Sequence, residues 1–188
     1  MAFWSNAQSE AKRNYRFKVT INAFTGYTGN NGTTSVWWAK TVALPSFEVS
    51  EVEHNHMDNK YYYPGRVSWN EVSMTLVDPI TPDATDMIND LLTRSGYKIP
   101  GNANDSASKS SIAKRTAANL GDVQIDVMDG EGKSIETWIL KRPFIKSAKF
   151  GDLDYSNDEL KQLDLSFRYD WATCKVDGED VRFDFAAN

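Results

Sequence analysis

Cysteine is almost missing from this chain of 188 residues, which has a single one, Cys174. One cysteine excludes an internal disulfide framework and favours a reducing compartment. Histidine is nearly as scarce, because His54 and His56 are the only two. Even with Asp58 close by, they do not supply the four ligands that a closed metal site normally uses, so we expect no metal.

Long apolar runs are also missing. No stretch approaches the roughly 18 to 20 residues of a membrane span, and the N-terminal segment lacks the apolar core of a signal peptide. The net charge of −5 argues against a protein that grips nucleic acid, because such binding depends on cations that neutralise phosphates. We therefore expect a soluble domain made inside the cell, with no membrane partner.

The residues that are present suffice for a sizeable core. Hydrophobic residues make up 40% of the chain and aromatic residues 12%, and this length fits one domain. We predict a single domain over 1–188, with a polar arm at 1–13 and a tail at 173–188. Alternating apolar and polar residues, bounded by turn residues, indicate strands. The predicted strands are 15–23, 36–44, 47–53, 67–77, 123–127, 134–140, 144–150 and 163–171, and Asp177-Gly178 indicates a small hairpin in the tail.

One segment has helical periodicity instead. Thr81 is a suitable N-cap and Pro82 a suitable first helical residue. An apolar stripe follows at helical spacing, formed by Ala84, Met87, Ile88, Leu91 and Leu92. We predict a helix over 83–94 and a weaker one over 106–120. Consecutive strands with short turns favour a mainly β fold, with two antiparallel sheets in a sandwich or barrel and one flanking helix.

The stretch from Leu44 to Asp78 is the least ordinary part of the sequence. Two predicted strands, 47–53 and 67–77, flank a polar segment, three tyrosines and Pro64-Gly65. Hairpin loops usually contain two to five residues. We therefore expect the polar arm at 48–64 to contact another chain.

We find no residue pattern typical of an enzyme. The chain has no nucleophile elbow, phosphate loop or dinucleotide fingerprint, and Cys174 has no neighbouring histidine. The pairs Glu51/Glu53 and Asp152/Asp154 are better interpreted as solvated charge in a chain with 26 acidic residues. We expect no catalysis and no cofactor. An alternative from another class is a carbohydrate-binding β-sandwich that uses Tyr61–Tyr63 and Trp69, although aromatic residues are also enriched at protein interfaces.

Several segments taken in order resemble the tail tube proteins of contractile-tailed, T-even-like bacteriophages, which are related in fold to type VI secretion (Hcp) tube proteins. The matching segments are AKTVALP at 39–45, YPGRVSWN at 63–70, the run 72–78, the helix 83–94 and LDLSFRYDW at 163–171. Together the resemblance covers most of residues 14–172.

This resemblance implies a structural protein whose hexameric rings stack into the hollow inner tube of a contractile tail, the conduit for genome ejection. The implied partners are other copies of the chain, the tail sheath protein, the baseplate or tube initiator, and the tape measure protein. DNA would pass through without specific binding. The implied location is the virion tail, after assembly in the host cytoplasm. A tube initiator, or the tube of a phage-derived contractile injection system, stays open as an alternative.

The resemblance also suggests two sets of site residues. The expected contacts between subunits or rings, lateral or axial, are Glu51, Glu53, His54, Asn55, His56, Asp58, Asn59 and Tyr61. Two polar strand faces are candidates for the lumen, one with Glu71, Ser73 and Thr75, the other with Gln162, Asp164, Ser166 and Asp170. Periodicity does not choose between these two faces. We expect a polar lumen that is net neutral or acidic, because a cationic wall would hold passing phosphates.

Overall fold

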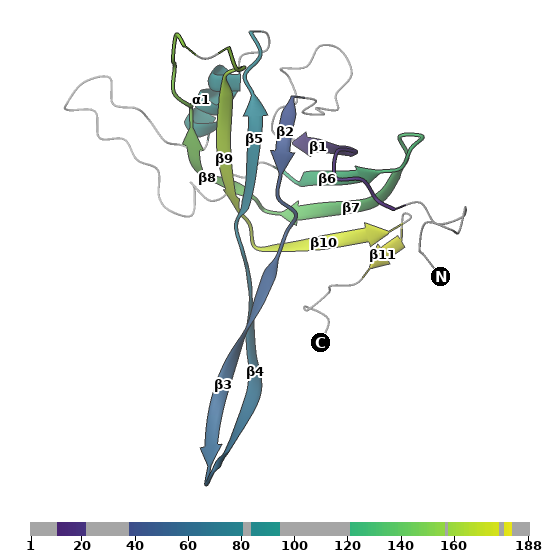
Figure 1. Cartoon of the computed structure of the whole chain (residues 1–188), viewed down its shortest axis with the longest axis vertical. Helices are drawn as coiled ribbons and strands as arrows, with labels where there is room; N and C mark the ends of the chain where they lie inside the picture. Colours follow the sequence, from purple (N-terminus) through teal and green to yellow (C-terminus); the bar gives the residue numbers. More distant parts are fainter. Residues whose placement is uncertain are drawn as a thin grey trace, which may run out of the picture.

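The computed structural model describes residues 11–21, 38–80, 84–94, 121–156, 158–176 and 179–181. These residues form eleven strands and one helix (Figure 1). The elements are β1 (Phe17–Ile21), β2 (Ala39–Val42), β3 (Phe47–His56), β4 (Asn59–Trp69), β5 (Val72–Val77), α1 (Ala84–Arg94), β6 (Val123–Met128), β7 (Ser134–Lys141), β8 (Phe144–Lys149), β9 (Gln162–Arg168), β10 (Trp171–Val176) and β11 (Glu179–Val181). No helix within the described residues has the length and hydrophobicity that crossing a membrane requires.

The strands form three antiparallel sheets. Sheet A has the order β1-β6-β7-β10-β11, sheet B the order β2-β5-β9-β8, and sheet C is the hairpin β3-β4. In Figure 1 the strands of sheet B run along the long axis of the molecule, whereas those of sheet A run across it. The predicted mainly β fold with antiparallel sheets and one helix is confirmed, but the sheets do not close into a barrel.

The core lies between sheets A and B, and the alternation in the sequence predicts its members well. In sheet A, pairing places Ile21, Val123, Leu140 and Ala172 in one row across four strands, with at most 1% of each residue exposed. In sheet B the same arrangement brings together buried residues of β5 and β9, in the pairs Val72–Phe167, Met74–Leu165 and Leu76–Leu163. The two inward faces belong to one hydrophobic cluster.

Helix α1 confirms the helix predicted over 83–94. Ala84, Met87 and Ile88 are buried in the same cluster as the two sheets. The backbone N–H of Ala84 donates to Oδ1 of Asp78 at 3.2 Å, so the residue that follows β5 also holds the first turn of the helix. The proposed cap at 81–83 and the side chains of Leu91 and Leu92 lie outside the described residues.

The segment 163–171, predicted as one strand, is in fact two. Strand β9 ends at Arg168 in sheet B, and β10 begins at Trp171 in sheet A. The change of sheet occurs at Tyr169-Asp170, where the N–H of Asp170 donates to the carbonyl of Lys141. Trp171 therefore does not share the buried face of Leu163 and is 42% exposed. Periodicity alone missed this corner because alternation continues through it.

The stretch 47–77 also differs from the prediction. The polar segment is not a loop, because β3 and β4 pair, with one shift of register, up to a two-residue turn, Met57-Asp58. Met57 has a φ of 53°, the left-handed conformation that tight hairpin turns require at their first central position. The predicted strand 67–77 is interrupted at Asn70-Glu71, between β4 and β5.

The β6–β7 hairpin follows its predicted turn. Oδ1 of Asp129 accepts the backbone N–H groups of Glu131 and Lys133, both at 2.9 Å, and Gly132 has a φ of 83°. The backbone hydrogen bond from Lys133 is the main reason that the pKa of Asp129 is below its usual value. Sequence and structure agree here because the turn is entirely local.

Several predictions fall outside the described residues. They are the weaker helix at 106–120, the first ten residues of the N-terminal arm, most of the connection before β2, and the tail after 181. The small hairpin predicted at 177–178 is confirmed by the pairing of β10 with β11, in which Val176 lies opposite Glu179.

Candidate assembly surfaces

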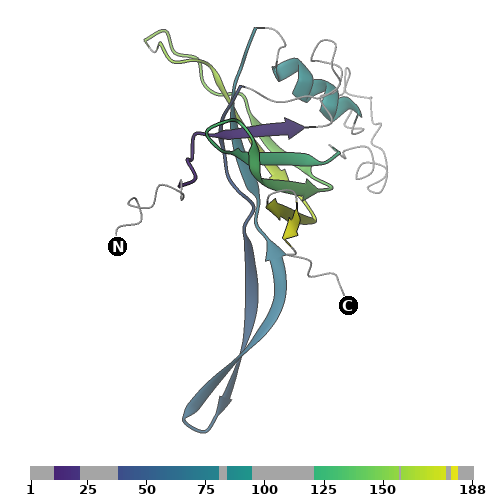
Figure 2. The same ribbon diagram turned by 90° about the vertical axis from the view of Figure 1, so that its right-hand side faces the viewer.

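The β3–β4 hairpin extends away from the two packed sheets (Figures 1 and 2). All ten residues of β3 are exposed, and β4 is exposed from Asn59 to Arg66. Only the base joins the core, where the rings of Phe47 and Trp69 meet edge to face at 5.4 Å and Trp69 is buried. Beyond this point the ribbon has no hydrophobic core of its own.

A bulge divides the hairpin near its middle. The register shifts between Val49 and Glu51, so that Gly65 and Arg66 both lie opposite Ser50. The N–H of Arg66 donates to the Ser50 hydroxyl at 2.8 Å. A Cβ on Gly65 would lie 2.4 Å from Ser50 Oγ and 2.9 Å from its carbonyl oxygen, so this close approach requires glycine.

Beyond the bulge the hairpin has two different faces, because directly paired residues point to the same side. One, the tyrosine face, consists of the pairs Val52–Tyr63, His54–Tyr61 and His56–Asn59. The other, the glutamate face, consists of the pairs Glu51–Pro64, Glu53–Tyr62 and Asn55–Lys60. Glu53 and Lys60 form an ion pair at 2.9 Å across the glutamate face.

The eight residues predicted as subunit contacts all lie on the hairpin, but they do not form one surface. Glu51, Glu53 and Asn55 belong to the glutamate face, and Asp58 lies in the turn. His54, His56, Asn59 and Tyr61 belong to the tyrosine face. The prediction omitted Val52 and Tyr63, which are 61% and 57% exposed. Their period-two alternation with Glu51 and Tyr62 was the signal that could have found them.

The two polar faces considered for the lumen are one face of sheet B. Strands β5 and β9 are neighbours, with Ser73 opposite Ser166 and Thr75 opposite Asp164. The Thr75 hydroxyl donates to Oδ1 of Asp164 at 2.7 Å, and the Ser166 hydroxyl donates to Glu71 at 3.2 Å. Periodicity left a choice between the polar face of β5 and that of β9. Because the two strands pair, no such choice remains.

Cations that the prediction missed lie among these residues. Lys146 forms an ion pair with Glu71, and Nη1 of Arg168 lies 3.9 Å from Oε1 of Glu71. The hydrogen bond from Lys146 is the main cause that lowers the pKa of Glu71. Lys149 lies opposite Asp164 on the same sheet. This face therefore has charges of both signs, with these three cations beside the carboxylates of Glu71 and Asp164.

Asp170 is not part of this face. It lies at the corner between sheets B and A, where its carboxylate is 3.6 Å from Nη1 of Arg142. The guanidinium of Arg142 also lies over the ring of Trp171, at 5.5 Å from the ring centroid. Its assignment to the candidate lumen was a consequence of treating 163–171 as one strand.

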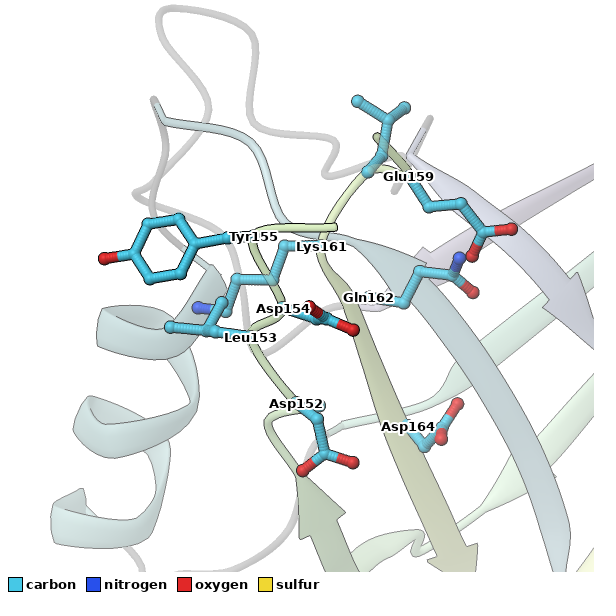
Figure 3. Close-up of a pocket in the computed structure, with 10 residues that line it drawn as sticks. Asp152, Leu153, Asp154, Tyr155, Glu159, Lys161, Gln162 and Asp164 are labelled. Atoms are coloured by element: carbon cyan, nitrogen blue, oxygen red, sulfur yellow. The ribbon is translucent and has the colours of Figure 1, made fainter. Parts of the chain in front are cut away.

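A second projecting element is the loop 151–161 between β8 and β9, which we call the apical loop. A cavity of about 710 Å³ lies against it, lined by side chains that include Asp152, Asp154, Glu159 and Asp164 (Figure 3). Among the described residues, no group of three or more His, Cys, Asp or Glu side chains is placed to hold a metal ion. Leu153, Tyr155 and Leu160 are strongly exposed on the loop.

The comparisons with known proteins fit this architecture. No protein-family model and no curated protein matches the chain. Among solved structures, the tube-terminating cap of the anti-feeding prophage is 13% identical, with a TM-score of 0.63 over 94% of this chain and 99% of that one. A chain of the PVC sheath–tube complex, from an extracellular contractile injection system, is 14% identical, with a TM-score of 0.57 over 94% and 99%.

The chain has the tail tube fold. A type six secretion system protein is also similar, with a TM-score of 0.50 and 8% identity over 88% of this chain and 89% of that one. The resemblance inferred from the sequence is therefore supported at the level of fold. Within the part of the chain that the structure describes, the β3–β4 hairpin and the apical loop both project from the packed sheets.

Proposed function

We propose that the chain is a structural subunit of the inner tube of a contractile tail, and that it assembles as hexameric rings which stack within a sheath. The observation that carries this proposal is the β3–β4 hairpin, whose apolar side chains have no core in the isolated chain. An isolated two-stranded hairpin is at best marginally stable in water. A second copy of the chain supplies the missing packing surface.

Sheet B is suited to lateral assembly. Its edge strands are β2 and β8, and because all three pairings within it are antiparallel, these two strands run in opposite directions. A rotation about an axis along the strands brings β2 of one copy beside β8 of the next as an antiparallel pair. The two edges of sheet B then become interfaces, and closure into a ring leaves neither of them exposed.

The polar face of sheet B would line the lumen of such a ring. Glu71, Ser73, Thr75, Gln162, Asp164 and Ser166 remain its proposed lining, together with the cations that accompany them. Paired charges and hydroxyls give a wetted wall without a strong field of one sign, which suits a cargo that must move. In a phage tail the cargo would be DNA.

A tube or tube-terminating component of a contractile injection system is the second candidate. The similarity to the cap of the anti-feeding prophage and to the PVC sheath–tube complex favours it. In both candidates the sheath and the baseplate are the expected partners, and the role is mechanical rather than catalytic. A sheath gene beside this one, with or without capsid genes, separates the phage from the injection system.

Electron microscopy and sedimentation of the purified protein test the proposal. We expect rings at micromolar concentration and stacked rings or tubes at higher concentration or after seeding with a baseplate. Cryo-electron microscopy of such tubes then shows whether the polar face of sheet B faces the channel. A strictly monomeric protein under all these conditions contradicts the proposal.

A further inference from the structure

The two histidines of the chain lie on one face of strand β3. One residue separates His54 from His56, and alternate residues of a strand point to the same side. Both histidines belong to the tyrosine face, opposite Tyr61 and Asn59 of β4. Both are exposed, so their ring nitrogens are accessible from the solvent.

The spacing of the two histidines suits a single metal ion. The Cα atoms of residues i and i+2 in a strand are about 6.6 Å apart, because each residue advances the strand by about 3.3 Å. Two nitrogens bound at about 2.0–2.1 Å to one tetrahedral ion lie about 3.3 Å from each other. Each imidazole ring therefore has to lean toward the other by less than about 2 Å, which rotation about the side-chain bonds supplies without moving the backbone.

Strand pairing maintains this spacing. Between the bulge opposite Ser50 and the turn at Met57-Asp58, β3 and β4 pair without a further shift of register. The backbone of both histidines is thus ordered before an ion arrives. Binding then costs less entropy than it would on a flexible segment, because a preorganised site has less freedom to lose.

The groups around the pair favour a transition metal. Imidazole nitrogens suit zinc, copper and nickel, whereas carboxylates suit magnesium and calcium. The neighbouring cation, Lys60, lies on the glutamate face and is paired there with Glu53 at 2.9 Å. On the tyrosine face, the phenol of Tyr61 and the amide of Asn59 can hydrogen-bond to the ring nitrogens that do not bind the ion. Such contacts orient the histidines of metal sites.

We infer that His54 and His56 together bind one divalent transition-metal ion, such as Zn²⁺, Ni²⁺ or Cu²⁺, on the surface of the hairpin. Among the described residues, no third His, Cys, Asp or Glu side chain forms a group with them, so water completes the coordination. The expectation of no metal concerned a closed site with four protein ligands, whereas this site is open and has two. The inference goes beyond the proposed function and requires no second copy of the chain.

The cavity beside the apical loop is the competing location for a cation. It is lined by carboxylates, which include Asp152, Asp154 and Asp164, and not by imidazoles. The Asp154 carboxylate already accepts the N–H and the hydroxyl of Ser156, at 2.9 and 2.8 Å. Variants of this loop therefore provide a control for the histidine pair.

Exchanging two neighbouring residues tests the pair. Asn55→His/His56→Asn keeps the composition of the chain but places the histidines on opposite faces, because adjacent strand residues point to opposite sides. A second ligand that binds within the same molecule raises affinity by about 10²- to 10⁴-fold. We therefore expect the dissociation constant for Cu²⁺, from isothermal titration calorimetry, to rise about a hundredfold or more. His54→Ala should cause a similar loss. Asp152→Asn/Asp154→Asn should change the constant by less than about threefold, since Cu²⁺ prefers imidazole to carboxylate.

Electron paramagnetic resonance of bound Cu²⁺ identifies the ligands in any assembly state. We expect one ion per chain in the wild type, with splitting from two imidazole nitrogens. The exchange variant should show splitting from one. Circular dichroism verifies that the variants keep the fold, as expected for changes at exposed positions of β3.

Several results would overturn the inference. If the wild type binds no Cu²⁺, or if the exchange variant binds it as tightly as the wild type, the two histidines do not act together. If Asp152→Asn/Asp154→Asn loses the ion instead, the ion belongs to the cavity. One ion per two chains, with four nitrogens, would replace the site within one chain by a site shared between copies. None of these results bears on the tube function, which the assembly of the metal-free wild type tests separately.

Discussion

The two packed sheets and the β3–β4 hairpin are both antiparallel β structure with alternating side chains, yet they are stabilised differently. In the two packed sheets, which we call the body, strands bury one face, and residues such as Phe167 and Leu165 are 1% exposed. In the hairpin, Val52 and Tyr63 alternate just as regularly and remain in water. Alternation therefore predicts that a segment is a strand, but burial depends on what is available to cover it.

This difference assigns the two regions different tasks. The body supplies the free energy of folding, because hydrophobic burial is its dominant favourable term. The hairpin contributes backbone pairing, a few cross-strand contacts and a large uncovered surface. Such a surface is understandable only in an assembly, so changes in the hairpin should affect assembly and changes in the body should affect stability.

The largest expected effect comes from removing the distal hairpin. Replacing residues 51–64 with Asn-Gly closes the ribbon just beyond Ser50 and leaves the contact of Phe47 with Trp69 intact. We expect a folded protein whose unfolding free energy changes by less than about 1 kcal/mol, since the removed residues are exposed. Stacking should be abolished, as seen by electron microscopy. An unfolded product would show that the hairpin belongs to the folding unit after all.

The body should respond in the opposite way to loss of one buried ring. Phe167→Ala leaves a cavity between the sheets and should lower the free energy of unfolding by about 3–5 kcal/mol. Tyr62→Ala, on the exposed hairpin, should cost no more than about 0.5 kcal/mol. Urea unfolding followed by circular dichroism measures both values. Equal losses would mean that the hairpin packs on a surface of its own chain in solution.

Two carboxylates, one buried in the body and one exposed on the hairpin, test the same difference in stability. Asp126 is 4% exposed and accepts hydrogen bonds from the Gln124 amide at 2.9 Å and the Thr137 hydroxyl at 2.6 Å. Asp126→Ala leaves these donors without their acceptor and should cost about 1–3 kcal/mol. Glu53→Ala removes only the exposed ion pair with Lys60 and should cost about 0.5 kcal/mol or less. Urea unfolding of the two variants decides whether burial sets the difference.

Sequence reasoning succeeded where a structure depends on neighbouring residues. The Asp129 turn, the buried rows of β5 and β9 and the helix at 84–94 follow from local spacing and alternation. Sequence reasoning failed where a structure depends on segments that are distant along the chain. The corner at Tyr169-Asp170 exists because β10 pairs with β7 in the other sheet. Because the sequence did not reveal that β5 pairs with β9, Ser73 and Ser166 were assigned to two candidate faces, although pairing places them side by side.

The two faces of the hairpin likewise depend on strand pairing, which local spacing does not determine. A bulge that places Gly65 and Arg66 opposite Ser50 shifts the register and thereby decides which residues share a side. The eight residues predicted as subunit contacts are therefore divided between the two faces and the turn. The prediction omitted Val52 and Tyr63, although both are exposed on the tyrosine face.

The smallest expected effect concerns pH and the local turn at Asp129 in the body. Hydrogen bonds from backbone N–H groups, chiefly that of Lys133, lower the pKa of Asp129 below its ordinary value. A carboxyl whose folded pKa is depressed contributes stability above its unfolded pKa and loses it as pH falls through the folded value. We therefore expect a slight loss of stability below about pH 4 that Asp129→Asn reduces, because the amide oxygen still accepts these bonds but does not titrate. Urea midpoints measured from pH 6 to pH 2.5 show the change in slope.

Asp129→Ala is the control, and it should lower the midpoint at neutral pH, where Asp129→Asn retains the turn. An unchanged acid slope in Asp129→Asn would assign the acid sensitivity of the body to other carboxylates, with Glu71 and its partner Lys146 the next pair to vary.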